Sequence, residues 1–223
     1  MAKTITIGSP FGSGTFAGGT QLTITIDSVS NPVSVQTVGA FTVETYNVIS
    51  GTAYMIDTGT GGTTDYTVTQ GAIVAPMSAT PATAEASLDP VTYTISFTTG
   101  NNVPSGGKVK VTFPSDIVIS DTSAATCTGT AGFQTSSLTC NPTSSSLDIT
   151  NGFTSEFTAG VLTFTVAAVR NPRSTLTTGS FSITTTDSSD NTIDVTSSGI
   201  TVTMTTVPNL SSVSVAGTDK TNG

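Results

Sequence analysis

Apolar and polar residues alternate with a period of two along most of this chain, and clusters of Gly, Pro, Asn, Asp and Ser interrupt the pattern at intervals of roughly 8–15 residues. Such short, regularly spaced runs are typical of β-sandwiches and barrels. No segment shows a convincing helical stripe, so the pattern predicts an all-β protein. The predicted strands are Thr4–Ile7, Gln21–Val29, Ala40–Thr45, Thr52–Asp57, Asp65–Thr69, Thr92–Thr98, Lys108–Phe113, Val161–Val169, Ser180–Thr186, Ile193–Thr196 and Gly199–Thr205.

One segment of the pattern occurs twice. Leu22–Thr45 recurs without a gap at Leu162–Thr185, with 11 of 24 positions identical. A long run of strand sequence precedes the second copy, whereas about twenty residues precede the first. We therefore predict two immunoglobulin-like β-sandwich domains in tandem: a first module, residues 1–72, that is incomplete, and a complete second module, residues 73–207.

The tail, residues 208–223, carries a short alternating run of its own. Val213 and Val215 alternate with serines, so Leu210–Ala216 is predicted to be a strand. Its place after the second module matches that of Ile73–Thr80 after the first. The tail therefore resembles the opening strand of a further module, and Leu210, Val213 and Val215 are candidate donor-strand residues.

Composition excludes several classes of partner. Charged residues make up 9% of the chain, and the formal net charge is −8. Nucleic-acid binding requires a basic footprint, which the six basic residues do not provide, and no apolar run approaches the 18 or so residues that span a bilayer. We expect neither nucleic acid as a partner nor a membrane-spanning segment. The basic residues are Lys3, Lys108, Lys110, Arg170, Arg173 and Lys220.

The absence of histidine excludes Ser–His–Asp and Cys–His catalysis. Two cysteines, Cys127 and Cys140, have twelve residues between them. A redox pair usually has the closer C-x-x-C spacing, so we predict a disulfide that clamps a loop or hairpin. Its loop closure contributes about 3 kcal/mol in the chain-entropy model. A disulfide indicates an oxidising compartment, and we predict an extracellular or cell-surface location.

Three motifs resemble functional sites, and each has a simpler structural interpretation. Asp57–Thr60 (DTGT) resembles an aspartic protease loop, but the chain has no second copy for the carboxylate pair, so we predict a turn. Asp187–Asn191 carries oxygens that suit Ca²⁺ without the spacing of a known loop, and it predicts a hairpin turn. Gly12–Gly19 lacks the lysine and helix of a phosphate loop. We expect no catalytic residue, no metal and no cofactor.

Glycans are the one covalent addition that the sequence favours. Asn209 begins the only N-glycosylation sequon, since a proline disqualifies Asn141. Clusters of hydroxyl residues offer O-glycosylation sites, although ordinary strand and loop hydroxyls explain them equally well. The candidate O-linked residues are Thr143, Ser144, Thr205 and Thr206.

Two segments carry a resemblance to a family. YTISFTTG…VPSGGKVKVTFPSDI (Tyr93–Ile117) and VLTFTVAAVRNP (Val161–Pro172) resemble immunoglobulin-like modules found in tandem in extracellular fibre and surface proteins. The resemblance covers about Leu22–Val207. It implies a fold and a cell-surface setting, and it implies no chemistry.

An incomplete module and a spare strand together suggest self-assembly. The hypothesis is a structural filament subunit whose C-terminal strand completes the first module of the next copy, which leads to head-to-tail polymerisation. This resembles donor-strand complementation in bacterial pili, where the donor is typically an N-terminal extension, so Thr4–Ile7 is a second candidate donor. The same sequence is compatible with a monomeric adhesin or carbohydrate-binding module, and with a fragment of a longer tandem surface protein.

Overall fold

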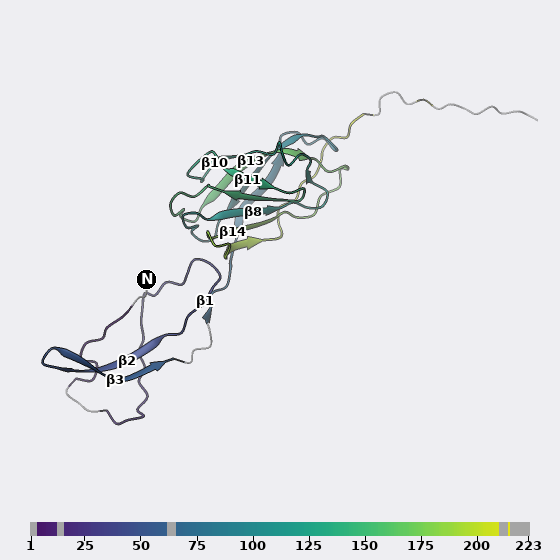
Figure 1. Ribbon diagram of the computed structural model, residues 1–223. Helices are drawn as coiled ribbons and strands as arrows, with labels where there is room; N and C mark the ends of the chain where they lie inside the picture. Colours follow the sequence, from purple (N-terminus) through teal and green to yellow (C-terminus); the bar gives the residue numbers. More distant parts are fainter. Residues whose placement is uncertain (1–3, 13–15, 62–65, 210–213, 215–223) are drawn as a thin grey trace, which may run out of the picture. The chain divides into compact units, whose positions relative to one another are not determined.

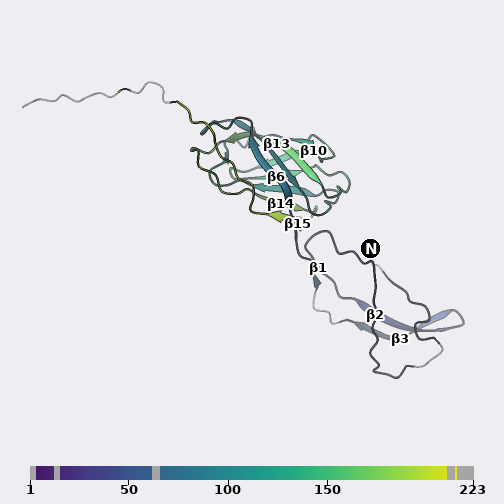
Figure 2. The ribbon, with the colours of Figure 1, turned by 180° about the vertical axis from the view of Figure 1, so that it is seen from behind.

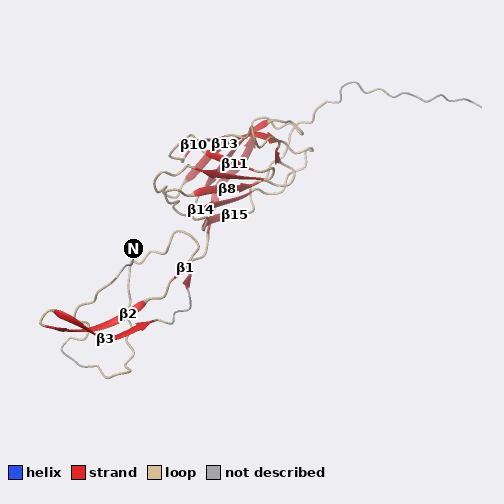
Figure 3. Cartoon of the chain, viewed as in Figure 1, coloured by secondary structure: helices blue, strands red, loops and turns tan. Residues whose placement is uncertain are grey.

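The computed structural model describes residues 4–12, 16–61, 66–209 and 214 of the chain. The chain divides into two compact units, Met1–Asn31 and Pro32–Gly223, each of which is described by itself. Every regular element of the described part is a β-strand (Figure 3). The all-β prediction is therefore confirmed.

Two mainly antiparallel layers form a β-sandwich in the second unit (Figures 1 and 2). The first layer has the strand order β10-β13-β7-β6, and the short strand β9 also pairs with β13. The central pair is the longest, because β13 and β7 match residue for residue from Val161–Thr98 to Val166–Tyr93. The strands of this layer are β6 (Val74–Pro81), β7 (Val91–Thr98), β9 (Val118–Ile119), β10 (Cys127–Ala131) and β13 (Val161–Arg170).

The second layer has six strands in the order β11-β12-β8-β14-β15-β5. All its neighbours are antiparallel except β15 and β5, which pair in parallel. Its strands are β5 (Gly71–Ala72), β8 (Lys108–Thr112), β11 (Thr139–Pro142), β12 (Ser146–Thr150), β14 (Ser182–Thr186) and β15 (Thr192–Thr196).

The core lies between these layers and follows the period-two pattern of the sequence. Alternate residues of β7 are fully buried, and so are alternate residues of β8 and β14 that face them from the other sheet. Burying a side chain such as Phe or Ile contributes about 1.5–3 kcal/mol. The large, fully buried side chains of the whole core include Tyr93, Ile95, Phe97, Leu147, Phe164, Phe181 and Ile183.

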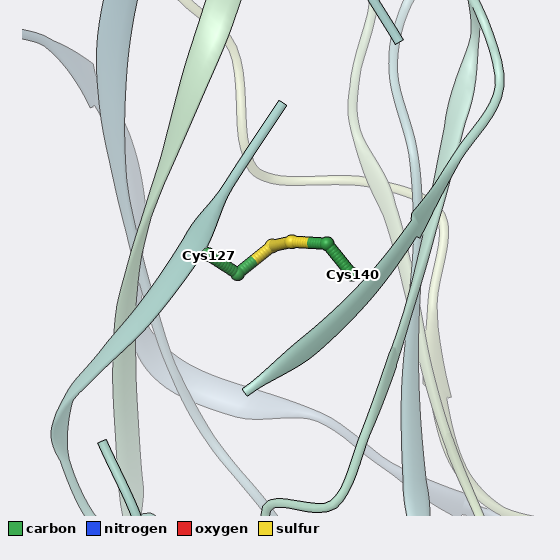
Figure 4. The surroundings of a disulfide bond; sticks show 2 residues. All are labelled: Cys127 and Cys140. Carbon is green, nitrogen blue, oxygen red and sulfur yellow. A yellow bond between two sulfur atoms is a disulfide. The ribbon is translucent and has the colours of Figure 1, made fainter. Parts of the chain in front are cut away.

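The predicted disulfide is confirmed, and it joins the two layers (Figure 4). Cys127 lies on β10 at the edge of the first layer, and Cys140 lies on β11 at the edge of the second. Their Cα atoms are 5.8 Å apart. The bond therefore links two different sheets, whereas the sequence suggested a clamp within one loop or hairpin.

The remaining strands form two small pairs. β2 (Thr42–Ile49) and β3 (Thr52–Thr60) make an antiparallel hairpin, and β1 (Thr37–Val38) pairs with β4 (Tyr66–Thr67). The β2–β3 hairpin turns at Ser50 and Gly51, both of which have positive φ. Glycine suits such a position because it has no Cβ to clash with the backbone.

Three predicted strands are absent from the described residues. Thr4–Ile7 and Gln21–Val29 form no β-ladder, because no described strand pairs with them. Gly199–Thr205 buries Ile200 and Met204, but its backbone bonds go to loop residues instead of a regular strand. The module limits at residues 72 and 207 stay predictions.

Candidate assembly surface

The β2–β3 hairpin carries large apolar side chains that are exposed to solvent. Soluble proteins rarely leave many such side chains uncovered on neighbouring strands, because their burial is the main driving force of folding. The sequence of the hairpin is thus of the kind that belongs in a core. The exposed residues are Phe41, which precedes β2, then Val43, Tyr46, Val48 and Ile49 on β2, and Tyr54, Met55 and Ile56 on β3.

This hairpin has a buried counterpart in the sandwich, the β14–β15 hairpin. The sequence repeat places Thr45 at the position of Thr185. Thr45 lies opposite Asp57, and Thr185 lies opposite Asp194. Immediately after each of these pairs the register shifts, so that one residue of the second strand has no partner. Both hairpins therefore share one β-bulge at one place.

Equivalent residues of the two hairpins differ sharply in exposure. Phe181 and Ile183 are 0% exposed, whereas their counterparts Phe41 and Val43 are 62% and 53% exposed. The side chain that precedes the aspartate shows the same contrast, because Ile193 is 1% exposed and Ile56 is 63% exposed. Equivalent apolar residues are thus buried in the β14–β15 hairpin and exposed in the β2–β3 hairpin.

The two hairpins also differ at one edge. In the sandwich, β14 lies between β15 and β8, and Ile183 pairs with Val111 while Thr185 pairs with Val109. Among the described residues, β2 pairs with β3 alone. The edge of β2 that corresponds to the β8 side of β14 has no described partner. A long apolar edge of this kind is a template for pairing with another strand.

A second exposed apolar row lies in the first unit. Leu22, Ile24 and Ile26 are between 47% and 54% exposed. The repeat places them at the positions of three fully buried residues of β13, each of which pairs with a residue of the neighbouring strand β7. The first unit therefore repeats the contrast seen in the hairpin. The buried counterparts are Leu162, Phe164 and Val166.

Asp194 shows what the shared Thr–Asp pair does when a hairpin is covered. It is 0% exposed, and its backbone N–H donates to Thr185 Oγ1 over 3.1 Å. Its carboxylate accepts the N–H groups of Gly100 and Asn101, each over 3.0 Å, and the Asn101 side-chain amide over 2.6 Å. A buried carboxylate needs such donors, because an unpaired buried charge is very costly. Asp194 thus fixes the loop after β7 to the second layer.

Asp57 has the same local arrangement in the exposed hairpin. Its backbone N–H donates to Thr45 Oγ1 over 3.2 Å, and the Thr45 hydroxyl lies 3.3 Å from Asp57 Oδ2. Among the described residues, Thr45 is the only side-chain donor to this carboxylate. Because Asp57 and its neighbours lie inside β3, the prediction of a turn at Asp57–Thr60 is wrong.

The predicted hairpin turn at Asp187–Asn191 is confirmed. It connects β14 to β15, and the Asp187 carboxylate accepts hydrogen bonds from Ser34, Ser189 and Asn191. Partial burial acts to raise the pKa of Asp187, but these hydrogen bonds outweigh it and hold the pKa below its usual value. Among the described residues no group of three or more acidic or cysteine side chains could hold a metal ion.

The candidate glycosylation residues are all exposed where the structure describes them. Asn209, Thr143, Ser144, Thr205 and Thr206 lie on the surface. Thr143 also closes a turn, because its hydroxyl accepts the Ser146 N–H over 2.9 Å. Glycosylation at these residues stays a prediction. The candidate donor-strand residues Leu210, Val213 and Val215 lie outside the described residues.

A shallow depression of about 570 Å³ lies beside the bulge in β13. Its polar groups already have partners. Ser120 Oγ donates to Asp89 Oδ1 over 2.6 Å, and Asp121 Oδ1 accepts from Ser123 and Ala124. The hydrogen bonds from Ser123 hold the pKa of Asp121 below its usual value. We assign this depression no ligand.

Sequence reasoning missed the Thr–Asp pair, although a signal was present. The sequence IDTGTGG begins at Ile56, and IDVTSSG begins at Ile193. The threonine lies 12 positions before the aspartate in the first case and 9 in the second. An alignment that allows an insertion of three residues would have joined the two motifs.

No protein-family model matches this chain, and no curated protein matches it. A solved structure that is similar is a non-cellulosomal cohesin from the hyperthermophilic archaeon Archaeoglobus fulgidus, with 14% sequence identity. The match has a TM-score of 0.31 and covers 60% of this chain and 93% of the cohesin. A similarity this distant carries no conclusion about function. Within the described part of the chain, no helix has the length and apolar character needed to cross a bilayer.

Proposed function

We propose that this chain is the structural subunit of an extracellular filament, and that copies join head to tail by β-strand addition. In this proposal the chain has two immunoglobulin-like modules, and a strand from a second copy pairs with β2, which among the described residues pairs with β3 alone. The observation that carries this proposal is the exposure of Phe41, Val43 and Ile56 at positions where the second module buries Phe181, Ile183 and Ile193.

The sandwich itself indicates what kind of segment would cover the hairpin. There, β8 lies beside β14 and contributes Val109 and Val111, which are both fully buried. The tail has the same Val-x-Val spacing in Val213 and Val215. A tail strand that pairs with β2 as β8 pairs with β14 would place Val215 opposite Val43. The occupant we propose is therefore the tail of a second copy of this chain.

Strand addition of this kind is strong enough to hold subunits together. Each backbone hydrogen bond contributes about 1 kcal/mol net, and each buried valine adds about 1.5–3 kcal/mol. The same strand also covers apolar side chains of the acceptor hairpin. Because the donor and acceptor lie on different parts of the chain, the contact is head-to-tail and propagates into a fibre.

The chemistry of the chain supports an extracellular setting. The cross-sheet disulfide between Cys127 and Cys140 is stable in an oxidising environment, as found outside the cell. The exposed hydroxyl residues and Asn209 are available for glycans there. An extracellular fibre with covalent glycans fits both features, and its partner is the chain itself.

Electron microscopy of the purified protein tests the proposal. The full chain should form filaments, and a variant that lacks residues 210–223 should remain monomeric. Adding a synthetic peptide of the tail to that variant should produce a one-to-one complex that cannot extend.

A shorter deletion is the matched control, because removing residues 218–223 leaves the predicted strand intact. Filaments should persist in that variant. Filaments of normal length from the chain without residues 210–223 would refute the tail as donor. A full-length chain that stays monomeric at high concentration would refute the filament itself.

A further inference from the structure

Asp57 in the exposed β2–β3 hairpin corresponds to Asp194, which holds the loop after β7 in the sandwich. Asp57 and Asp194 share the threonine opposite, the N–H bond to its Oγ1, and the adjacent bulge. Asp194 is fully buried and accepts three hydrogen bonds from the Gly100–Asn101 loop. Asp57 is exposed, and Thr45 is its only described side-chain donor.

We infer that Asp57 is the polar anchor of the assembly surface, which is the face of the β2–β3 hairpin that carries Val43 and Thr45. We further infer that it binds N–H or O–H donors of the incoming copy as Asp194 binds Gly100 and Asn101. This inference rests on the proposed function, because it assumes that strand addition covers the hairpin. It extends that function by naming the residue that accepts the polar contact and the chemistry that the partner must supply.

Chemistry explains why a carboxylate lies beside exposed apolar side chains such as Val43 and Ile56. When the hairpin is covered, a carboxylate without donors would oppose assembly, since burying an unpaired charge is costly. A carboxylate that receives donors forms charge-assisted hydrogen bonds, which are about twice as strong as neutral ones. Asp57 therefore selects for a segment that brings donors to the correct position, and it disfavours a shifted register.

The tail carries suitable donors. Asn209, Ser211 and Ser212 directly precede Val213 in the sequence. If Val213 lies opposite Thr45, as Val109 lies opposite Thr185, these residues come immediately before the tail residue that is next to the Thr45–Asp57 pair. An asparagine amide is also the side chain that binds Asp194. The second copy thus has donors of the right kind in the sequence just before Val213.

The test compares Asp57→Asn with Glu44→Gln. Both variants remove one negative charge from the same hairpin, but Glu44 and Thr45 are adjacent on β2, so their side chains point to opposite faces. Asp57→Asn should raise the concentration needed for filament formation about tenfold or more, because it replaces charge-assisted bonds and introduces a competing donor. Glu44→Gln should change it by less than about twofold, as an exposed charge contributes little.

Sedimentation of filaments measures this concentration, and thermal unfolding of the chain without residues 210–223 tests for a local role. Asp57→Asn should leave the melting temperature of that monomer unchanged. A lowered melting temperature would overturn the inference, because Asp57 would then be satisfied within its own chain. Equal filament thresholds for Asp57→Asn and Glu44→Gln would overturn it as well. If the unmodified chain forms no filaments, the proposed function fails first, and that outcome is distinct from either result.

Discussion

The β2–β3 and β14–β15 hairpins have related sequences, one shared bulge and opposite environments. In the sandwich, the surrounding strands bury alternate residues such as Ile183 in the core. Val43, at the equivalent position of the β2–β3 hairpin, stays exposed. Alternation therefore specifies which face of a strand is apolar, and it does not specify whether a partner covers that face. The difference between the hairpins lies in the strands around them.

The largest expected effect comes from the equivalent phenylalanines. Phe181→Ala should lower the free energy of unfolding by about 3–5 kcal/mol, because it removes a fully buried ring. The centroid of this ring lies 5.3 Å from that of the Phe113 ring. Phe41→Ala should change it by less than about 0.5 kcal/mol in the monomer, since the ring is exposed. Denaturant unfolding of the chain without residues 210–223 measures both values.

Similar decreases in the free energy of unfolding for Phe181→Ala and Phe41→Ala would contradict the difference between the two hairpins. They would mean that Phe41 is covered by its own chain, and the proposal of a second copy would lose its main support. A loss of filaments in Phe41→Ala with unchanged monomer stability would sharpen the comparison instead.

The disulfide provides the next largest effect, and it acts on the sandwich alone. Replacing Cys127 and Cys140 together by alanine should lower the free energy of unfolding by about 3 kcal/mol, mainly by releasing a constraint on the unfolded chain. Denaturant unfolding with and without the substitutions measures the loss. Because the bond joins β10 to β11, the variant should still assemble under conditions in which it remains folded. Filament loss in a folded variant would contradict this separation.

Two tyrosines allow the same comparison for a polar contact. Tyr93 is 0% exposed and donates to Asn171 Oδ1 over 2.6 Å, and burial raises the pKa of its hydroxyl so that it stays protonated. Tyr46 is exposed and donates to Glu44 over 2.5 Å, and this hydrogen bond raises its pKa. Tyr93→Phe should cost about 1–2 kcal/mol, because it leaves a buried amide oxygen without its donor.

Tyr46→Phe should have no measurable effect on the free energy of unfolding of the monomer, since water replaces the lost partner. Both values come from denaturant unfolding at neutral pH. An equal cost at the two positions would show that the hairpin is protected from water in the single chain.

The sequence predicted the sandwich because its strands have both a regular pattern and partners within the chain. Thr92–Thr98 and Ser180–Thr186 were located to within a residue or two at each end, since a strand with one buried face has a strongly specified register. The pairing of Cys127 with Cys140 was also predictable, as no other cysteine exists. Its cross-sheet position was not, because spacing along the chain does not show which strand lies at which edge.

Prediction was weakest where a segment depends on partners far away in the sequence. Gln21–Val29 has the alternation of a strand, yet it forms no ladder among the described residues. Asp57 was assigned to a turn because aspartate and glycine favour turns, whereas pairing with Thr45 extends β3 through this motif. Local preference was overridden in both cases by the presence or absence of a neighbouring strand.

The smallest expected effect is a change in the pH dependence of stability. It involves Asp187 and its hydrogen bond from Ser34, a residue that precedes β1 in the sequence. Ser34 Oγ donates to Asp187 over 2.8 Å. Partial burial acts to raise the pKa of Asp187, but the hydrogen bonds from Asn191, Ser34 and Ser189 together keep it below its usual value of about 3.9. A carboxylate with a lowered folded-state pKa adds stability above its unfolded pKa, and this stability is lost as the pH falls through the folded value. Asp187→Asn should therefore flatten the loss of stability as the pH falls below the usual carboxyl pKa of about 3.9.

Asp116→Asn is the control for this last change, because Asp116 is exposed on the same unit. Thermal unfolding at several pH values compares the variants with the unmodified chain. A pH profile of Asp187→Asn that coincides with that of Asp116→Asn would contradict the role of Asp187. A flattened profile for Asp187→Asn alone would show that the hydrogen bonds to this carboxylate from Ser34, Ser189 and Asn191 contribute to the stability of the folded chain.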